Sequence, residues 1–214
     1  MTASSAEKSR PQGRPPREEA ADIRQQIMDA AVDLFAHQGY AATSVRVIAE
    51  RVGVNPAMIH YYFGSKEALL HAALEQSLEP LAEAVAAMQK QQEAPLEDII
   101  SLIISAFASK PSLPILMTRE VMLPGGMLQE HFKKNFAHRL GGALPQLLLG
   151  EQARGRLNAD LDPRLVAQVL FGLCAFPFIS RSLAEPVLGL SYDDEGIQKI
   201  ENNIKELLQK GFYP

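Results

Sequence analysis

The residues best suited to recognising another molecule lie on a short helix that the sequence predicts to begin at Pro56. Helical spacing gives this helix an outer face that carries Asn55, Pro56, Ala57, His60 and Tyr61. Backbone N–H groups and polar side chains at such a helix end can face phosphates and base edges in the major groove of DNA. The chemistry indicated is therefore noncovalent recognition of a nucleic acid.

Two short helices and the turn between them would position this face. Thr43 and Ser44 are good N-cap residues for the first helix, and Gly53 can end it because glycine readily adopts a left-handed backbone. Asn55 is an N-cap for the second helix, Pro56–Tyr61. This pattern is typical of a helix-turn-helix. A helical hairpin that only packs against another part of the chain has the same pattern, so spacing alone leaves both interpretations open.

The remaining sequence also has a helical period, and no stretch alternates as a strand would. We expect an all-α fold of about nine helices. Besides the two short ones, the expected helices are Glu18–Gln38, Ser65–Gln92, Pro95–Ala108, Leu113–Val121, Gly126–Leu149, Pro163–Ala184 and Asp193–Lys210. Pro177 lies inside one of them and removes a hydrogen bond, so a kink is expected there.

The composition excludes several classes of protein. The chain has 214 residues, a net charge of −4, 47% apolar residues and one cysteine, Cys174. These values indicate a folded protein with a core and argue against disulfide scaffolds and cysteine-based zinc modules. The longest apolar run, residues 169–179, is too short to span a membrane, and residues 1–19 show no signal peptide. We therefore expect a cytoplasmic protein without a membrane partner.

Charge is distributed unevenly along the chain. The basic and acidic side chains of residues 1–70 cancel, so the net negative charge falls on residues 71–214. A DNA-binding function must therefore rest on local features. Residues 1–17 are rich in Pro, Gly and Ser and are predicted to form a disordered basic arm, whose Arg14 could enter a minor groove.

The first third of the chain, about residues 18–70, closely resembles the DNA-binding domain of TetR/AcrR-type transcriptional regulators. The residues that carry the resemblance are Ile27, Ala30-Ala31, Leu34-Phe35, Gly39-Tyr40, Thr43-Ser44, Ile48-Ala49, Gly53-Val54, Ile59-His60-Tyr61-Tyr62-Phe63 and Ser65-Lys66-Glu67-Ala68-Leu69. The sequence departs from the family pattern at His60, where tyrosine is usual, and at Tyr62, where histidine is common. The resemblance implies a helix-turn-helix domain over residues 18–66 and a ligand-binding and dimerisation domain over residues 67–214, joined by a long helix.

The resemblance also implies a role for each matching residue at the DNA. Thr43 and Ser44 would contact phosphate, and Arg46 would reach a phosphate or a guanine edge. Tyr61 would bond a phosphate through its hydroxyl, and Lys66 would hold another at the start of the long helix. The residues that would face the major groove are Asn55, Pro56, Ala57 and His60.

Residues 71–214 contain no catalytic motif, so we expect no enzymatic activity, cofactor or metal site. Large, adaptable apolar side chains in the middle helices could line a pocket for a small apolar effector, although such residues often form only core. The pocket candidates are Phe107, Met117, Met122, Phe132, Phe136, Phe171 and Cys174.

The last two expected helices carry apolar stripes that could form a dimer interface. The stripe residues are Leu165, Val169, Leu173, Phe176, Ile197, Ile200, Ile204 and Leu208. In the family the two C-terminal helices pair with their twofold mates, and the resemblance implies the same pairing here. The alternative is a core within one chain.

The leading hypothesis is a homodimeric, ligand-responsive repressor that binds a palindromic operator in double-stranded DNA and is released by a small apolar effector. An activator of the same fold is a variant that the sequence does not separate from it. An all-helical ligand-binding protein without a DNA role is a less favoured hypothesis from another class.

Overall fold

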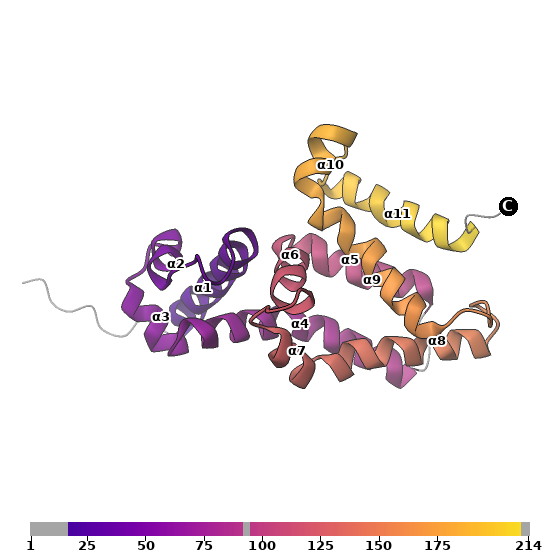
Figure 1. Ribbon diagram of the computed structural model, residues 1–214, viewed down its shortest axis with the longest axis horizontal. Helices are drawn as coiled ribbons and strands as arrows, with labels where there is room; N and C mark the ends of the chain where they lie inside the picture. Colours follow the sequence, from indigo (N-terminus) through magenta and orange to yellow (C-terminus); the bar gives the residue numbers. More distant parts are fainter. Residues whose placement is uncertain (1–16, 92–94, 211–214) are drawn as a thin grey trace, which may run out of the picture.

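The computed structural model describes residues 17–91 and 95–210, and over these ranges the chain is helical, without a strand. The predicted all-α class is confirmed. The helices α1 (Arg17–Gln38), α2 (Val45–Val52) and α3 (Pro56–Phe63) form a three-helix unit at one end of an elongated molecule (Figure 1). Arg14 and the predicted arm up to residue 16 lie outside the described residues.

The three-helix unit packs around a small core. Its fully buried side chains include Ile27 and Phe35 from α1, Ile48 and Ala49 from α2, and Ile59 from α3. The small side chain of Ala49 lets neighbouring helices approach closely, because no bulky group separates them. This core fixes how α2 and α3 sit on α1.

The long helix α4 (Lys66–Gln91) joins this unit to the rest of the molecule, because it packs on α1 and α3 as well as on α5 and α8 (Figure 1). The η elements below are π-helices. The remaining elements are α5 (Leu96–Ser109), α6 (Ser112–Met117), η1 (Thr118–Met122), α7 (Gln129–Asn135), η2 (Ala137–Gly142), α8 (Ala143–Ala153), α9 (Pro163–Ile179), α10 (Arg181–Leu188) and α11 (Asp194–Lys210).

The prediction of a single helix over Gly126–Leu149 is wrong. The structure has α7, η2 and α8 in this region, and helix begins only at Gln129. Gly125 has a positive φ of 85°, which forms a turn before α7. The π-helical segment η2 ends in Gly141-Gly142, where two residues of low helix propensity allow the wider turns. Residues 17–91 and 95–210 therefore form more helical elements than the expected nine.

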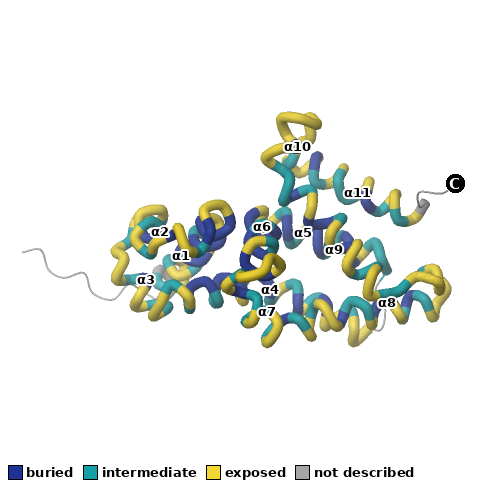
Figure 2. Tube along the Cα trace, in the orientation of Figure 1, coloured by how far each residue is buried: buried dark blue, intermediate teal, exposed yellow. Residues whose placement is uncertain are grey.

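The predicted helix over Pro163–Ala184 is divided into α9 and α10, which meet at an angle of 69°. Pro177 lies in the last turn of α9, where it cannot donate a backbone hydrogen bond. The expected kink is therefore a complete break, located three residues later at Ser180. The break turns α10 outward, and Figure 2 shows α10 as largely exposed.

Among the described residues, no single helix is both long and apolar enough to cross a bilayer, and two pairs meet the length and composition requirements only together, across bends of 94° and 69°.

Candidate nucleic-acid interface and effector cavity

Side-chain caps and one glycine set the geometry of α2 and α3. The Ser44 hydroxyl accepts a hydrogen bond from the Val47 N–H at 3.3 Å, and the Asn55 carboxamide oxygen accepts one from the Ala57 N–H at 2.9 Å. Gly53 ends α2 with a left-handed φ of 78°, which most other residues resist. The sequence therefore specifies both helices and the turn between them locally, as predicted.

The outer face of α3 is open to solvent. Asn55, Pro56, Ala57 and His60 are exposed, and 69% of Tyr61 is exposed, whereas Ile59 on the opposite face is fully buried. The predicted recognition face thus projects from the molecule. Contact of these residues with DNA remains a prediction.

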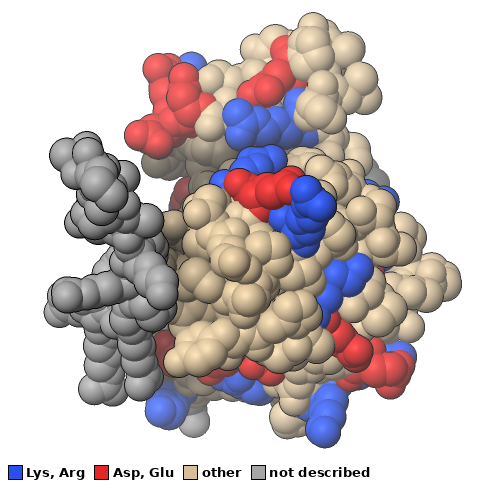
Figure 3. Space-filling view, turned by 90° about the vertical axis from the view of Figure 1, so that its left-hand side faces the viewer, with Lys and Arg blue, Asp and Glu red and all other residues tan. Residues whose placement is uncertain are grey.

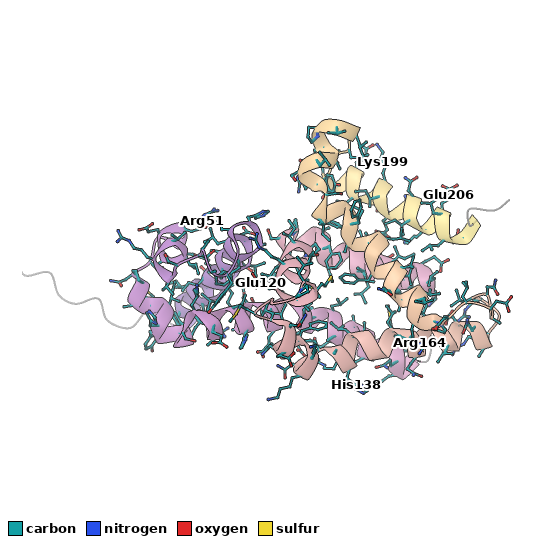
Figure 4. The ribbon with its side chains drawn as sticks, viewed as in Figure 1. Arg51, Glu120, His138, Arg164, Lys199 and Glu206 are labelled. Atoms are coloured by element: carbon teal, nitrogen blue, oxygen red, sulfur yellow. The ribbon has the colours of Figure 1, made fainter. Side chains whose placement is uncertain are left out.

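Two arginines of α2 are also exposed near this face. The Arg46 side chain is 81% exposed and pairs with Glu50 one turn later, with 2.9 Å between Nε and Oε1. Arg51 points away from the body of the molecule (Figure 4). Figure 3 faces this end of the molecule and shows Lys and Arg side chains around a broad uncharged surface, with acidic side chains among them. An exposed ion pair such as Arg46–Glu50 is weak enough for a phosphate to compete for the guanidinium.

Thr43 does not have the predicted role. Its side chain is fully buried, and its hydroxyl lies 2.8 Å from the Gly39 carbonyl and 3.3 Å from the Leu34 carbonyl, both of which can accept its proton. A hydroxyl in this position cannot reach a phosphate. Thr43 instead stabilises the turn between α1 and α2, and Ser44 is the exposed hydroxyl at the start of α2.

Lys66 is also engaged within the chain. Its ammonium donates hydrogen bonds to the carbonyl oxygens of Tyr40, at 2.8 Å, and Thr43, at 2.9 Å, and lies 4.0 Å from the centre of the Tyr40 ring. A lysine has three N–H donors, so one remains. The phosphate contact expected of Lys66 stays a prediction, and a structural role for this side chain was missed by the sequence analysis.

The helices from α4 onwards form the larger helical part of the molecule. This part contains a cavity of about 480 Å³, which is within the range of small-molecule sites. Apolar residues from α4 to α9, with both π-helical segments η1 and η2, form nearly all of its wall. Those from α4 and α5 are Leu78, Leu81, Val85, Met88, Ile99, Leu102, Ile103 and Phe107. The wall on α4 extends from Leu78 to Met88, about 15 Å along the helix axis.

Five of the seven predicted pocket residues line this cavity: Phe107, Met117, Met122, Phe132 and Phe171. Phe136 and Cys174 do not, and both are buried in the core. Burial raises the pKa of the Cys174 thiol to about 12. The predictions that Phe136 and Cys174 line the pocket are wrong, because residue type alone does not separate a core side chain from one that faces empty space.

The polar side chains of the cavity wall are Arg164 and Gln168 of α9. Arg164 forms two hydrogen bonds with Asp162, at 2.6 and 3.0 Å, and its side chain is 82% exposed. These hydrogen bonds lower the pKa of Asp162 to about 2. Arg164 therefore lies where the cavity meets solvent, near α8 (Figure 4), and a ligand there would meet a charged side chain at one end and apolar walls beyond it.

The predicted dimer stripe on α9 is exposed. Leu165, Val169 and Phe176 are 61%, 55% and 66% exposed. Leu183 and Val187 of α10 are exposed to a similar extent, 64% and 66%. A run of exposed apolar side chains over two adjoining helices is typical of an interaction surface.

The stripe on α11 does not lie on this surface. Ile204 is buried in its own chain, so the prediction that it contacts a partner is wrong. The other α11 candidates, Ile197, Ile200 and Leu208, and also Leu173 of α9, are partly buried against the core. The cause is that α11 packs its apolar face on α5 and α9, which is the intrachain alternative left open by the sequence.

Comparison with known proteins gives the class to which this geometry belongs. Residues 27–73 match the family model described as bacterial regulatory proteins, tetR family. The chain is 36% identical over 91 residues to the HTH-type transcriptional regulator BetI of Rhizobium meliloti (strain 1021), and it covers only 45% of the length of that regulator. It is 27% identical over 196 residues to the fatty acid metabolism regulator protein of Bacillus subtilis (strain 168), which is 88% of this chain and 94% of that protein.

Two solved structures share the fold over nearly the whole chain. A TetR/AcrR-family transcriptional regulator from Thermobifida fusca superposes with a TM-score of 0.58 and 27% identity, over 90% of this chain and 100% of that one. FadR from Bacillus subtilis, in complex with stearoyl-CoA, gives a TM-score of 0.65 and 24% identity, over 88% and 99%. Residues 27–73 thus match the tetR family of bacterial regulatory proteins, and the chain as a whole shares the fold of a TetR/AcrR-family regulator. Proteins of this family are transcriptional regulators and not enzymes.

Proposed function

We propose that this protein is a ligand-responsive transcriptional repressor that binds operator DNA through α2 and α3. The observation that carries the proposal is the exposed face of α3, Asn55–Tyr61, held outward by the two caps and by buried Ile59. A helix end of this kind fits the major groove, where it can meet phosphates and base edges together. Such a protein would work in the cytoplasm, where the chromosome of a bacterium is.

A dimer would allow two copies of α3 to read a palindromic operator. The exposed apolar side chains of α9 and α10, from Leu165 to Val187, support pairing through these helices. Two α3 helices related by a twofold axis would enter successive major grooves about one helical turn apart. α11 would support this surface from behind and contribute few contacts.

The cavity supports an effector with a long apolar part and a polar head. Its apolar wall follows about 15 Å of α4, and Arg164 and Gln168 supply polar groups at one end. Stearoyl-CoA, the ligand of the related FadR structure, has this chemistry. We propose a fatty acyl thioester or a similar amphipathic molecule, which would release DNA because it binds more tightly to a form whose α3 helices are wrongly spaced.

The DNA claim is tested by selecting binding fragments from genomic DNA and measuring the affinity of the purified chain for them. We expect sequence-preferring binding that weakens as salt is raised, because phosphate contacts release counterions. Binding without sequence preference, or no salt-sensitive binding, would overturn the proposal.

The effector claim is tested by titrating the DNA-free protein with stearoyl-CoA. Leu144→Trp places a large ring in the cavity and should weaken binding at least tenfold, whereas Leu149→Trp, on the exposed side of the same helix, should not. Equal affinity of both variants would place the ligand outside the cavity. No binding to the unmodified chain would exclude this effector class and leave the DNA claim intact.

A further inference from the structure

We propose that η1 transmits the state of the cavity to the three-helix unit, and that Arg119 and Glu120 are the positioning residues of this connection. The proposal rests on the proposed function and adds the physical route between its two sites. Consecutive residues of η1 have different neighbours: Val121 and Met122 line the cavity, and Arg119 and Glu120 bind the end of α1 and the turn that follows it. Glu120 lies at this junction in Figure 4.

Arg119 covers the C-terminal end of α1. Its Nη1 donates to the carbonyl oxygens of Ala36 and His37, at 3.2 and 3.3 Å, and its Nη2 approaches the carbonyl of Gln38 at 3.5 Å. These carbonyls have no partner within their own helix, so a cation there is favourable. A Cβ at Gly39 would lie 2.7 Å from Arg119 Nη2, so the guanidinium packs directly against this glycine.

Glu120 joins the turn after α1 to the loop after η1. It is 7% exposed, and its two carboxylate oxygens accept hydrogen bonds from the N–H groups of Tyr40, at 3.2 Å, and Met127, at 3.1 Å. A Cβ at Gly126 would overlap the Glu120 carbonyl, at 2.3 Å, so the loop packs directly on this residue. A buried carboxylate with such partners cannot shift alone, because leaving it without hydrogen bonds is costly.

The same turn is bound from the other side by the start of α4. Lys66 donates to the carbonyls of Tyr40 and Thr43, and α4 begins two residues after Gly64, which ends α3. A displacement of Glu120 would therefore reach Tyr40, then Lys66, and then the end of the helix that faces DNA. The first two steps in this route are hydrogen bonds, and the last is the short backbone connection between Lys66 and Gly64.

The π-helical geometry of η1 makes it a suitable element for this transmission. Its defining bond runs from the Leu123 N–H to the Thr118 carbonyl at 3.1 Å, and π-helical turns are rare and concentrate at functional sites. A ligand that pushes on Met117, Val121 or Met122 would change how this short segment is wound. Because binding linkage is reciprocal, DNA at α3 must change the affinity of the cavity for its effector by the same factor, and we expect η1 to respond to DNA for this reason.

The reciprocal direction allows a test without knowledge of the effector. Hydrogen exchange of residues 118–128 is measured for the full chain with and without a DNA duplex recovered from the genomic selection. We expect DNA to slow exchange of the Met127 amide at least about fivefold in the unmodified chain. In Arg119→Ala and Glu120→Gln the slowing should fall below about twofold, and Arg119→Lys should recover part of it.

Ser112→Ala is the matched control, because the Ser112 hydroxyl bonds Asp33 of α1 at 2.6 Å without adjoining the η1 wall of the cavity. It should retain the full response to DNA. The proposal is overturned if Arg119→Ala and Glu120→Gln respond like the unmodified chain, if Ser112→Ala loses as much, or if DNA does not slow exchange in η1 at all. If Arg119→Ala fails to fold, the exchange of Glu120→Gln and Arg119→Lys tests the proposal instead. Fluorescence anisotropy measures DNA binding separately, so a chain that binds no DNA contradicts the proposed function instead.

Stearoyl-CoA provides a second arm. The quantity measured is the ratio of DNA affinities without and with stearoyl-CoA. In the unmodified chain this ratio should be at least about five, and in the Arg119 and Glu120 variants it should fall towards one. A purely structural role would lower stability and both affinities while leaving the ratio unchanged, and that result would also overturn the proposal.

Discussion

The three-helix unit and the larger helical part are built by different rules. In the three-helix unit, side-chain caps fix where α2 and α3 start, and buried side chains pack tightly between these two helices and α1. The larger part contains two π-helical segments, three helices with an internal proline, and a cavity of about 480 Å³. The difference indicates that the DNA-facing end is held in one geometry, whereas the rest has room to change.

The contrast has a physical basis in packing. A close-packed core resists small displacements because every side chain has neighbours on all sides. A cavity wall lacks neighbours on one side, so its side chains can move at lower cost. The two parts should therefore differ most in how they respond to the loss of a leucine.

The largest expected effect is on stability. Leu34→Ala removes a side chain that is 3% exposed in the core of the three-helix unit, and it should lower the free energy of unfolding by about 3 kcal/mol. Leu144→Ala, on the cavity wall, should cost less than about 1.5 kcal/mol, because its methyl groups already border empty space. Urea unfolding monitored by circular dichroism measures both. Equal losses would show that the two parts are packed alike.

The next effect is on DNA binding. Arg46→Ala should weaken operator binding by about 1–3 kcal/mol if the guanidinium reads a base edge, or reduce the salt slope by about one if it contacts a phosphate. Stability should change by less than about 0.5 kcal/mol, because the Arg46–Glu50 pair is exposed. Arg139→Ala, which removes the ion pair with Glu79 on α4, is the control and should leave DNA affinity unchanged. An Arg46 variant that binds normally would remove α2 from the interface.

The same contrast decides how much could be predicted from the sequence. Ser44, Gly53 and Asn55 act on backbone groups within a few residues of themselves, so their types report the local structure directly. The starts of α2 and α3 and the outward face of α3 were predictable for this reason, whereas α3 continues beyond its predicted end at Tyr61 to Phe63. Thr43 was not, because it resembles a cap in sequence and its burial depends on Leu34 and Gly39.

In the larger part, whether a prediction for a residue was right depended on partners far away in the sequence. The spacing of Ile204 fits a dimer stripe and a core equally well, and only the packing of α11 on α5 separates the two. Phe136 and Phe132 are of one type, four residues apart, yet only Phe132 borders the cavity. Arg119 and Glu120 gave no signal beyond being neighbouring charges, because their partners lie about 80 residues earlier.

A smaller effect should follow from removing a cap. Ser44→Ala deletes the hydroxyl that accepts the Val47 N–H, and it should destabilise the protein by about 1 kcal/mol. The thermal unfolding midpoint measures this loss. Ser182→Ala, at an exposed position inside α10, should leave the midpoint nearly unchanged. If the two variants behave alike, the cap does not define the start of α2.

The smallest effect concerns the region where α4 passes between the two parts. His71 of α4 stacks on His131 of α7, with ring centroids 4.0 Å apart, and His131 Nε2 lies 3.0 Å from Glu75 Oε1. Burial, and then the charge of His131, lower the pKa of His71 below its ordinary value of 6.5, and the nearby Glu67 and Glu75 carboxylates oppose this shift without reversing it.

Because the folded chain protonates His71 less readily than the unfolded chain, stability is retained above the unfolded pKa and lost as the pH falls through 6.5 towards the lower folded value. Urea midpoints measured between about pH 7.5 and pH 5.5 should therefore decrease, and His71→Gln should flatten part of that slope. His138→Gln, at an exposed position of η2, should keep the slope. A slope that persists in His71→Gln would assign the pH dependence to other groups and leave the junction insensitive to protons.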